Sequence, residues 1–277
     1  MRNREKIRSQ SIFFWIKLLA GVYCGAAVAL YFMQHKLLFH PSSLPGNHKF
    51  DFKNTFEEIN FRPDSETSIH LIRFIPADSV EKKGAVIYFH GNSENINHYA
   101  IHADRFLSFG YEVWMMDYPG FGKSTGKMDI ELLYHSAGEV YKMVREKGFS
   151  PQNILIYGKS LGTGIASNLA SKKECRHLIL ETPYYSLGYA ASKHLWMFPV
   201  EYMMKYEIPS YKYFKDIAAP VTIFHGTKDE VVSYKNAALL AKNFKKTDRL
   251  ITIEGGKHND LNNFPQMQNK LNELLSD

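Results

Sequence analysis

An uninterrupted run of apolar residues lies near the N-terminus of this chain. Residues 12–33 contain one charged side chain, Lys17. A helix of this length extends about 33 Å at ~1.5 Å per residue, which is enough to cross the hydrocarbon core of a bilayer. Lys17 lies close enough to the N-terminal end of the run for its ammonium group to reach the membrane interface. The pattern therefore predicts a transmembrane anchor over 12–33.

Three other interpretations of this run stay open. Ala27-Val28-Ala29 resembles a signal-peptidase site, which would make the run a cleaved signal, although more apolar residues follow it. Cys24 would suit a lipoprotein signal, but the bulky Tyr23 precedes it. A helix buried in a soluble core is the third interpretation. We expect a retained anchor, followed by a juxtamembrane connector over 34–53, where two prolines and a glycine interrupt any regular pattern.

The pattern changes from about residue 54 onward. Residues 55–61 and 68–75 alternate apolar and polar positions, which predicts a hairpin at the edge of a sheet. Short apolar runs, typical of strands buried on both faces of a parallel sheet, follow at 85–90, 111–117, 153–157, 177–181, 221–225 and 249–254. Apolar residues over 129–148 recur at helical spacing. This alternation predicts an α/β domain over 54–277, with a mostly parallel sheet and helices on both faces.

Composition and charge exclude several classes of protein. Hydrophobic residues at 45% and charged residues at 22% are typical of a globular chain, and two cysteines cannot build a disulfide framework or a four-cysteine zinc site. The formal charge of +6 is mostly local, because residues 1–17 contribute a net +4, leaving +2 for the other 260. We therefore expect no nucleic-acid partner. Residues 1–11 form a basic tail, and the positive-inside rule places this tail in the cytoplasm and the domain on the non-cytoplasmic side.

The motif G-x-S-x-G occurs twice, in different surroundings. Ser160 directly follows the predicted strand 153–157 and precedes a helical segment, which is the strand–turn–helix context of a nucleophile elbow. Ser124 lies in a glycine-rich loop several residues beyond a strand. That loop resembles a phosphate-binding loop, but Asp117 stands where the first glycine of that motif is required. Ser160 is therefore the predicted nucleophile, and Ser124 the predicted member of a tight loop.

A serine nucleophile needs a base and an acid that orients the base. Asp229 and His258 each follow a later predicted strand, in the order that places them beside the serine at one edge of the sheet. Glu230 is the alternative acid. The predicted oxyanion hole consists of the backbone N–H groups of Leu161 and Asn92, with Ser93 as the alternative to Asn92.

The loop that contains Asn92 also contains a histidine. His90 immediately follows the predicted strand, and we expect it to be structural, with its imidazole hydrogen-bonded within the loop.

These segments together resemble the α/β-hydrolase superfamily. The resemblance rests on HGNSENI, DYPGFGKSTG, YGKSLGTG, ETPYYSL, HGTKDEVV and GGKHND, in this order, and covers residues 54–275. It is closest to the small, membrane-anchored serine hydrolases, which include depalmitoylase-like and lysophospholipid lipase-like members. Pro119 and Ser233 depart from the pattern, since many relatives have arginine and proline there. The resemblance implies a Ser-His-Asp triad of Ser160, His258 and Asp229, but does not specify the substrate.

The stretch 183–219 is too short for a large cap domain. It forms either a short lid that accepts an acyl chain or a helix packed on the edge of the sheet. In the first case Trp196, Met197 and Met203 are candidate substrate contacts, because flexible and aromatic side chains suit an acyl group.

The expected protein is a single-pass membrane serine hydrolase acting on a small-molecule or lipid-like acyl ester or thioester, without a metal or organic cofactor. Its oligomeric state stays open. The alternatives are a serine peptidase of proline-iminopeptidase type and a non-catalytic interaction module on a hydrolase scaffold.

Overall fold

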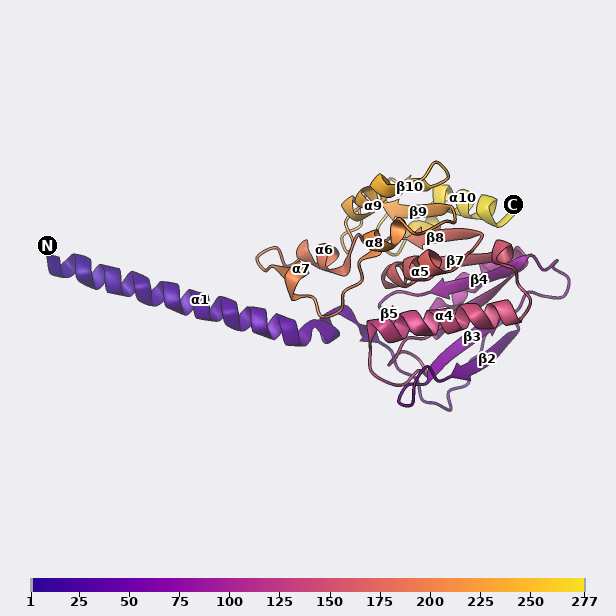
Figure 1. Ribbon diagram of the computed structural model, residues 1–277, viewed down its shortest axis with the longest axis horizontal. Helices are drawn as coiled ribbons and strands as arrows, with labels where there is room; N and C mark the ends of the chain where they lie inside the picture. Colours follow the sequence, from indigo (N-terminus) through magenta and orange to yellow (C-terminus); the bar gives the residue numbers. More distant parts are fainter. Residues whose placement is uncertain (1, 277) are drawn as a thin grey trace.

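A long helix extends away from the rest of the chain (Figure 1). The computed structural model describes residues 2–276, with side chains from residue 11 onward. Helix α1 (Arg2–Leu38) contains a 28-residue apolar stretch, Ser11–Leu38, whose most apolar 18 residues have a mean hydropathy of 1.9 and are not buried against the rest of the protein. The helix includes residues 34–38, which were expected in the connector, because backbone hydrogen bonding continues where the apolar side chains end. The side chains of residues 1–10 in the predicted basic tail lie outside the described part.

Within residues 2–276, eight strands form one sheet in the order β10-β9-β8-β7-β4-β6-β3-β2. Their bounds are Phe56–Phe61 (β2), Ile69–Phe74 (β3), Gly84–Phe89 (β4), Tyr111–Met116 (β6), Ile154–Lys159 (β7), His177–Glu181 (β8), Val221–Gly226 (β9) and Arg249–Ile253 (β10). Neighbouring strands are parallel except in the pairs β2–β3 and β3–β6. The predicted edge hairpin is therefore confirmed.

Burial along the strands follows their position in the sheet. Every residue of β4, β6, β7 and β9 is buried, as their apolar runs predict. The same prediction is wrong for β10, where only Ile253 is buried. The reason is that β10 forms the edge of the sheet and has a neighbouring strand, β9, on one side only.

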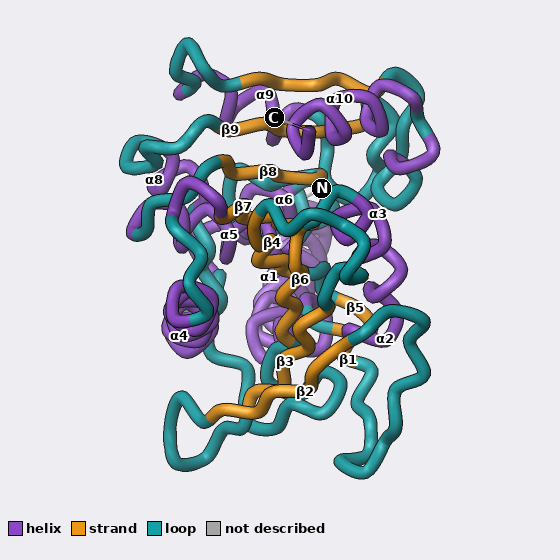
Figure 2. The backbone as a smooth tube through the Cα atoms, turned by 90° about the vertical axis from the view of Figure 1, so that its right-hand side faces the viewer, coloured by secondary structure: helices purple, strands orange, loops and turns teal. Residues whose placement is uncertain are grey.

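Helices cover both faces of the sheet (Figure 2). One face carries α4 (Ile130–Glu146), α5 (Leu161–Lys172), α8 (Ser210–Phe214) and α9 (Lys235–Leu240). The other carries α2 (Ile96–Tyr99), α3 (Ala103–Ser108) and α10 (Pro265–Ser276). Helix α4 confirms the helix expected over 129–148. Each face has its own apolar core, so the sheet is a rigid platform whose strand ends carry the site.

Several short elements lie close to the end of α1. Helices α6 (Leu187–Ser192) and α7 (Val200–Met203) belong to the predicted lid stretch and pack against each other. Strand β1 (His40–Pro41) pairs in parallel with β5 (Ser93–Glu94), so the chain that leaves α1 runs beside the loop after β4. The chain therefore passes from the apolar helix directly to the edge of the site.

Candidate active site

Ser160 lies at a sharp turn between β7 and α5. Its backbone has φ 48° and ψ −115°, a strained conformation for a residue other than glycine. The turn brings strand and helix so close that a Cβ at Gly158 would lie 2.6 Å from the Gly162 carbonyl oxygen and 2.7 Å from Thr163 Cα. A Cβ at Gly162 would lie 2.1 Å from the Phe89 carbonyl oxygen, so both glycines of the motif need to be small, and the serine hydroxyl is held at the carboxyl end of the sheet.

The structure brings the predicted triad residues together in one hydrogen-bonded chain. His258 Nε2 lies 2.9 Å from Ser160 Oγ, and His258 Nδ1 lies 2.7 Å from Asp229 Oδ2. With the proton on Nδ1, the imidazole donates to the carboxylate and accepts from the serine hydroxyl. Ser160 and His258 each retain 9% exposure, so the chain is nearly closed to solvent. The alternative acid, Glu230, is exposed.

The carboxylate of Asp229 is held by several donors. Its Oδ1 accepts hydrogen bonds from the backbone N–H groups of Val231 (2.9 Å) and Val232 (2.8 Å). Burial alone would raise the pKa of Asp229, but hydrogen bonds from His225 and His258 and the backbone donor outweigh it and hold this pKa well below its ordinary value. The carboxylate is therefore ionised when it faces His258.

His225 is a residue of the site that the sequence analysis missed. Its Nε2 donates to the Val232 carbonyl oxygen at 2.8 Å and lies 3.4 Å from Asp229 Oδ2. It fixes the loop that carries the acid. The sequence could have identified His225 by its place at the end of the apolar run 221–225, four residues before Asp229. An imidazole that is fully buried there requires a polar partner.

The loop after β4 lies beside the serine. A Cβ at Gly91 would be 3.9 Å from Ser160 Cβ, so the next residue, Asn92, stands close to the predicted reaction centre. In residues 2–276 neither the Asn92 N–H nor the Leu161 N–H donates to another protein group. Leu161 is the first residue of α5, where helical N–H groups have no intrahelical acceptor.

The same loop is joined to the end of α1. Asn92 Nδ2 donates to the Leu38 carbonyl oxygen at 2.8 Å, and His40 N donates to the Asn92 carbonyl oxygen at 2.8 Å. His90 behaves as expected of a structural residue, because its Nδ1 lies 2.8 Å from the Gly91 carbonyl oxygen and its ring stacks on Tyr118. The position of the predicted oxyanion loop thus depends on the segment that follows the apolar helix.

Ser124 lies in a different environment. Its hydroxyl donates to the Asp117 carbonyl oxygen and accepts from His70 N, each at 2.8 Å. Asp117 in turn accepts from Ile96 N at 2.9 Å. These bonds fix the loop between β6 and α4, and the hydroxyl has no contact with the imidazole of His258.

A buried ion pair lies below the turn, and the sequence analysis did not identify it. Lys159 and Glu181 stand opposite each other in the parallel register of β7 and β8 and form a salt bridge, and Tyr157 Oη donates to Glu181 at 2.5 Å. Burial alone would raise the pKa of Glu181, but the charge and hydrogen bond of Lys159 and the hydrogen bond of Tyr157 outweigh burial, so this pKa lies below its ordinary value. Lys159 occupies a variable position of G-x-S-x-G, so the motif gave no sign of the pair.

The predicted substrate contacts are not gathered at the triad. Trp196 and Met197 are 78% and 60% exposed. Met203 borders a small apolar pocket whose other wall is the end of α1, at Leu30 and Leu37. Within the stretch 183–219, residues 197–205 lie along α1, whereas Tyr184 and Phe214 are buried in the core of the domain.

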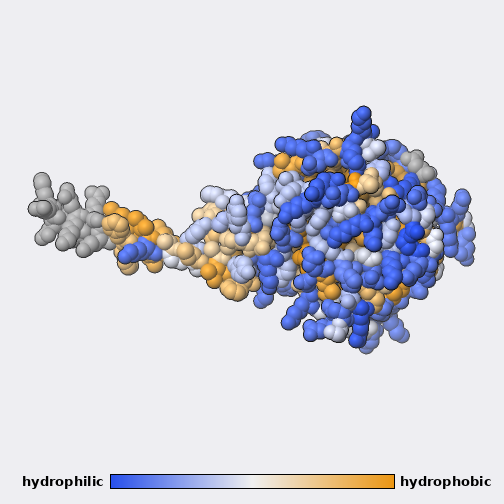
Figure 3. All heavy atoms as spheres, in the orientation of Figure 1, coloured by the Kyte–Doolittle hydropathy of each residue, from blue (hydrophilic) through white to orange (hydrophobic). Residues whose placement is uncertain are grey.

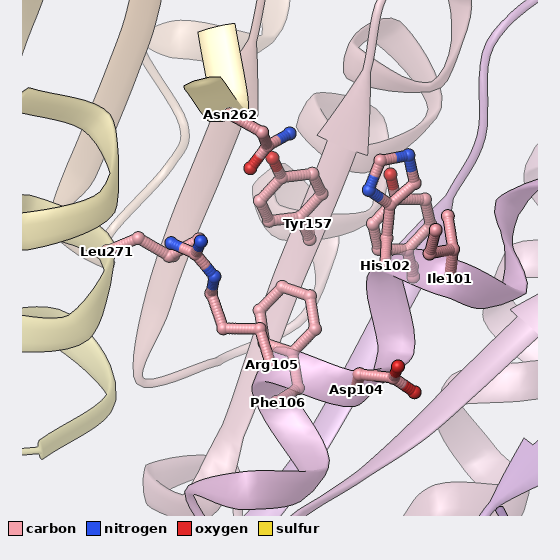
Figure 4. A pocket seen from close by; sticks show the side chains of 9 residues that line it. Ile101, His102, Asp104, Arg105, Phe106, Tyr157, Asn262 and Leu271 are labelled. Carbon is pink, nitrogen blue, oxygen red and sulfur yellow. The ribbon is translucent and has the colours of Figure 1, made fainter. Parts of the chain in front are cut away.

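A separate cavity lies on the other face of the sheet. It has a volume of about 350 Å³ and is bounded by α3, α10 and the strand residues Tyr88 and Tyr157. Figure 4 shows the Arg105 guanidinium turned toward Tyr157 and Asn262. Because no triad residue lines this cavity, we place the candidate chemistry at the Ser160 end of the sheet.

The strand order, the elbow after β7 and the residues that meet there define a class of protein. The chain has the α/β-hydrolase fold, which the solved structures of hydrolases share. Residues 80–213 match the family described as serine aminopeptidase, S33. This match includes Ser160 and ends before Asp229 and His258.

Relatives and solved structures share the same fold. The chain is 26% identical over 218 residues to alpha/beta hydrolase domain-containing protein 17C of Mus musculus, covering 77% of this chain and 65% of that protein. For protein 17B of Homo sapiens the identity is 26%, with coverages of 72% and 68%. An esterase of Pyrococcus furiosus superposes with a TM-score of 0.66 at 18% identity, covering 86% of this chain and 97% of that chain. Est1E from Butyrivibrio proteoclasticus, with ferulic acid bound, gives 0.62 at 18%, covering 79% and 96%.

Proposed function

We propose that this protein is a serine hydrolase that cleaves a carboxylic ester or thioester of an acyl group through an acyl-enzyme. The observation that carries the proposal is the unbroken chain from Asp229 through His258 to Ser160, at a serine with positive φ. This arrangement supports nucleophilic attack, because the imidazole accepts from the hydroxyl while its other nitrogen is held by an ionised carboxylate.

The proposed reaction has two halves. Ser160 Oγ bonds to the substrate carbonyl carbon while its proton passes to His258 Nε2. Collapse of the tetrahedral intermediate breaks the bond to the alcohol or thiol, which leaves with that proton. A water molecule then attacks the acyl-enzyme, gives a proton to His258 and releases the carboxylic acid as Ser160 regains its proton. The N–H groups of Asn92 and Leu161 would bind the oxyanion in both halves.

Helix α1 is proposed as a membrane anchor for this domain. The length and hydropathy of Ser11–Leu38 support it, as does the exposure of its most apolar 18 residues, and a cleaved signal sequence is the alternative. The basic residues before residue 12 favour a cytoplasmic N-terminus and a domain on the other side of the membrane. Anchoring would raise the local concentration of lipid-borne acyl substrates. Protease added to sealed cells should then digest the domain, whereas protection would reverse the orientation.

A serine peptidase that removes N-terminal residues is the second candidate, favoured by the match to the serine aminopeptidase family. Such an enzyme needs an acidic group to bind the substrate's free amine. Asp229 is occupied by His258, and Glu181 is paired with Lys159, so neither carboxylate is free for that purpose. An interaction module without activity would not require the hydrogen-bonded triad.

The decisive experiment is labelling with a fluorophosphonate followed by assay of nitrophenyl esters and amino-acid amides. Wild type should be labelled and should hydrolyse the esters, and Ser160→Ala should lose both properties. Ser124→Ala is the matched control, since it removes the other motif serine, and it should keep the label if it folds. Label on Ser160→Ala would reject the proposed nucleophile, and turnover of amides in preference to esters would favour the peptidase.

A further inference from the structure

Large apolar side chains are exposed in α7 and in the segment between α6 and α7. Trp196, Met197 and Tyr202 are 78%, 60% and 93% exposed. Exposed apolar side chains that cluster in this way indicate an interaction surface. Figure 3 shows apolar side chains along α1 and a mostly hydrophilic face on the domain, and this segment lies where the two meet.

The segment runs along α1. Tyr23 Oη donates to the Met197 carbonyl oxygen at 2.9 Å, and the Tyr23 ring stacks on Phe198 with centroids 4.9 Å apart. Nearer the domain, Gln34 Nε2 donates to the Met203 carbonyl oxygen at 2.7 Å. Tyr23 and Gln34 are eleven residues apart, so the segment follows the helix axis for roughly 16 Å.

The contact at Tyr23 lies deep in any bilayer that α1 crosses. About 20 residues cross the hydrocarbon core, and the apolar stretch extends from Ser11 to Leu38. With the predicted span 12–33, Tyr23 lies ten residues from the end that faces the domain, or roughly 15 Å inside the core, which is the depth of one leaflet. Met197 and Phe198 share that depth.

Backbone groups in hydrocarbon must be hydrogen-bonded within the protein, and several groups of this segment are. Tyr23 and Gln34 give their hydrogen bonds to Met197 and Met203, and Gln34 Oε1 also accepts from Lys205 N at 2.7 Å. Within the segment, Phe198 N donates to the Leu195 carbonyl oxygen at 2.9 Å. The polar side chains of an apolar helix are thus used to satisfy the backbone of a segment beside it.

Charged residues lie at the domain end of the segment. Glu201 is exposed and belongs to α7, whose last residue, Met203, is level with Gln34. Lys193 and Lys205 flank the segment on either side, and long lysine side chains suit the membrane interface. The apolar residues near Tyr23 therefore suit the hydrocarbon region of one leaflet, and the charged residues near Gln34 suit its polar headgroup region.

We propose that residues 195–203 are a second membrane-inserted element, which enters the leaflet nearer the domain beside α1 and places Trp196 and Met197 in lipid hydrocarbon. This inference rests on the proposed anchoring of α1. It gives Trp196 and Met197 the bilayer as their partner, in place of the bound acyl chain that the lid alternative assigned to them. We infer lipid, and not a second copy of the chain, because the segment lies along α1, which is itself proposed to be surrounded by lipid.

Depth can be measured with nitroxide labels on the full-length protein in phosphatidylcholine vesicles. Cys24→Ser and Cys175→Ser provide the background, and single labels are placed at Met197→Cys, Val28→Cys and Ile101→Cys. Val28 lies on α1, and Ile101 is 72% exposed on the domain, which makes it the matched control for Met197. The Met197 label should collide with oxygen in preference to a water-soluble nickel chelate, as the Val28 label does, and the Ile101 label should show the opposite preference.

The outcomes separate this inference from the anchoring on which it rests. If the Val28 label meets oxygen while the Met197 label meets the nickel chelate, the inserted segment is rejected and the anchor stands. If both meet the chelate, anchoring itself fails. A Met197 label shielded from both reagents would show that protein covers the segment, which also rejects lipid contact.

An independent measurement keeps the native cysteines. In Trp15→Phe protein, the remaining tryptophans are Trp196 and the buried Trp114, which is 1% exposed. Phosphatidylcholine brominated on its acyl chains should quench the fluorescence of this protein. The Trp15→Phe/Trp196→Phe control, which retains only Trp114, should not be quenched, and equal quenching in the two proteins would contradict the inference.

Discussion

Replacement of Asp229 by asparagine tests the proposed role of the acid loop. The carboxylate uses both oxygens: Oδ2 faces His258 Nδ1, and Oδ1 accepts from Val231 and Val232 N–H. An asparagine has one acceptor oxygen and one NH₂ group. Turning the NH₂ group toward the two backbone donors would leave those donors unpaired, at a cost of about 1–3 kcal/mol for each buried group.

The backbone donors therefore keep the amide oxygen and turn the NH₂ group toward His258. His258 Nδ1 must then accept, which places the ring proton on Nε2 and directs it at Ser160 Oγ. In that tautomer the imidazole cannot take the serine proton. We expect kcat to fall by about 10⁴, which corresponds to roughly 5 kcal/mol of transition-state stabilisation, with little change in KM.

The assay is steady-state hydrolysis of a nitrophenyl ester, with thermal unfolding to check the fold. Glu230→Gln is the control, because it makes the same chemical change one residue away at an exposed side chain, and it should keep nearly full activity. Equal losses in the two variants, or a larger loss for Glu230→Gln, would refute the reasoning and move the acid to Glu230.

Three further predictions follow from local geometry. Gly158→Ala should lower the free energy of unfolding, measured in urea, by about 1–3 kcal/mol, because the added Cβ would overlap the backbone at Gly162 and Thr163. In the control, Gly138→Ala in α4, the added Cβ meets nothing within 4 Å, so this variant should be as stable as wild type or more stable. Similar effects of the two substitutions would reject the close packing of the turn. The pKa of Asp229 lies below its ordinary value of 3.8, so the ionised carboxylate stabilises the fold above that pH, and this stabilisation is lost as the pH falls through the folded-state pKa. The free energy of unfolding of wild type should therefore fall more steeply in acid than that of Asp229→Asn. An equal dependence on pH in the two proteins would contradict this. Trp196→Ala should change stability in detergent by no more than about 0.5 kcal/mol and leave hydrolysis of dissolved short esters unaltered, and a large loss of activity would return Trp196 to the substrate site.

Much of the fold could be predicted because burial leaves a periodic record in the sequence. The central strands β4, β6, β7 and β9 are buried on both faces, so their apolar runs match the observed bounds to within about two residues. The sequence of β10 looks similar, but its burial depends on a place at the edge of the sheet, which no local pattern specifies. The pairing of β1 with β5 involves two residues on each side, too few to produce any period.

The residues of the candidate site likewise include some that the sequence could predict and some that it could not. Ser160, Asp229 and His258 could be predicted because each follows a strand, and strand ends converge at one edge of the sheet. His225 and the Lys159–Glu181 pair could not, because their roles arise from neighbours brought together by the fold. The contacts of Tyr23 and Gln34 with residues about 170 positions away are likewise tertiary.

These long-range contacts change what the apolar helix can do. A helix that served only as a tether would end in a flexible connector, and its position would not affect the site. Here the Leu38 carbonyl oxygen accepts from Asn92, whose N–H is a proposed oxyanion donor. On the opposite side of the site, Lys193 donates to the Glu230 carbonyl oxygen, and His194 Nε2 lies 3.1 Å from the Val231 carbonyl oxygen, so the two residues directly before the proposed inserted segment bind the loop that carries Asp229. Both halves of the proposed machinery are therefore connected to membrane-facing elements, and the depth of those elements in the bilayer would set the position of the reacting groups relative to a lipid-borne ester.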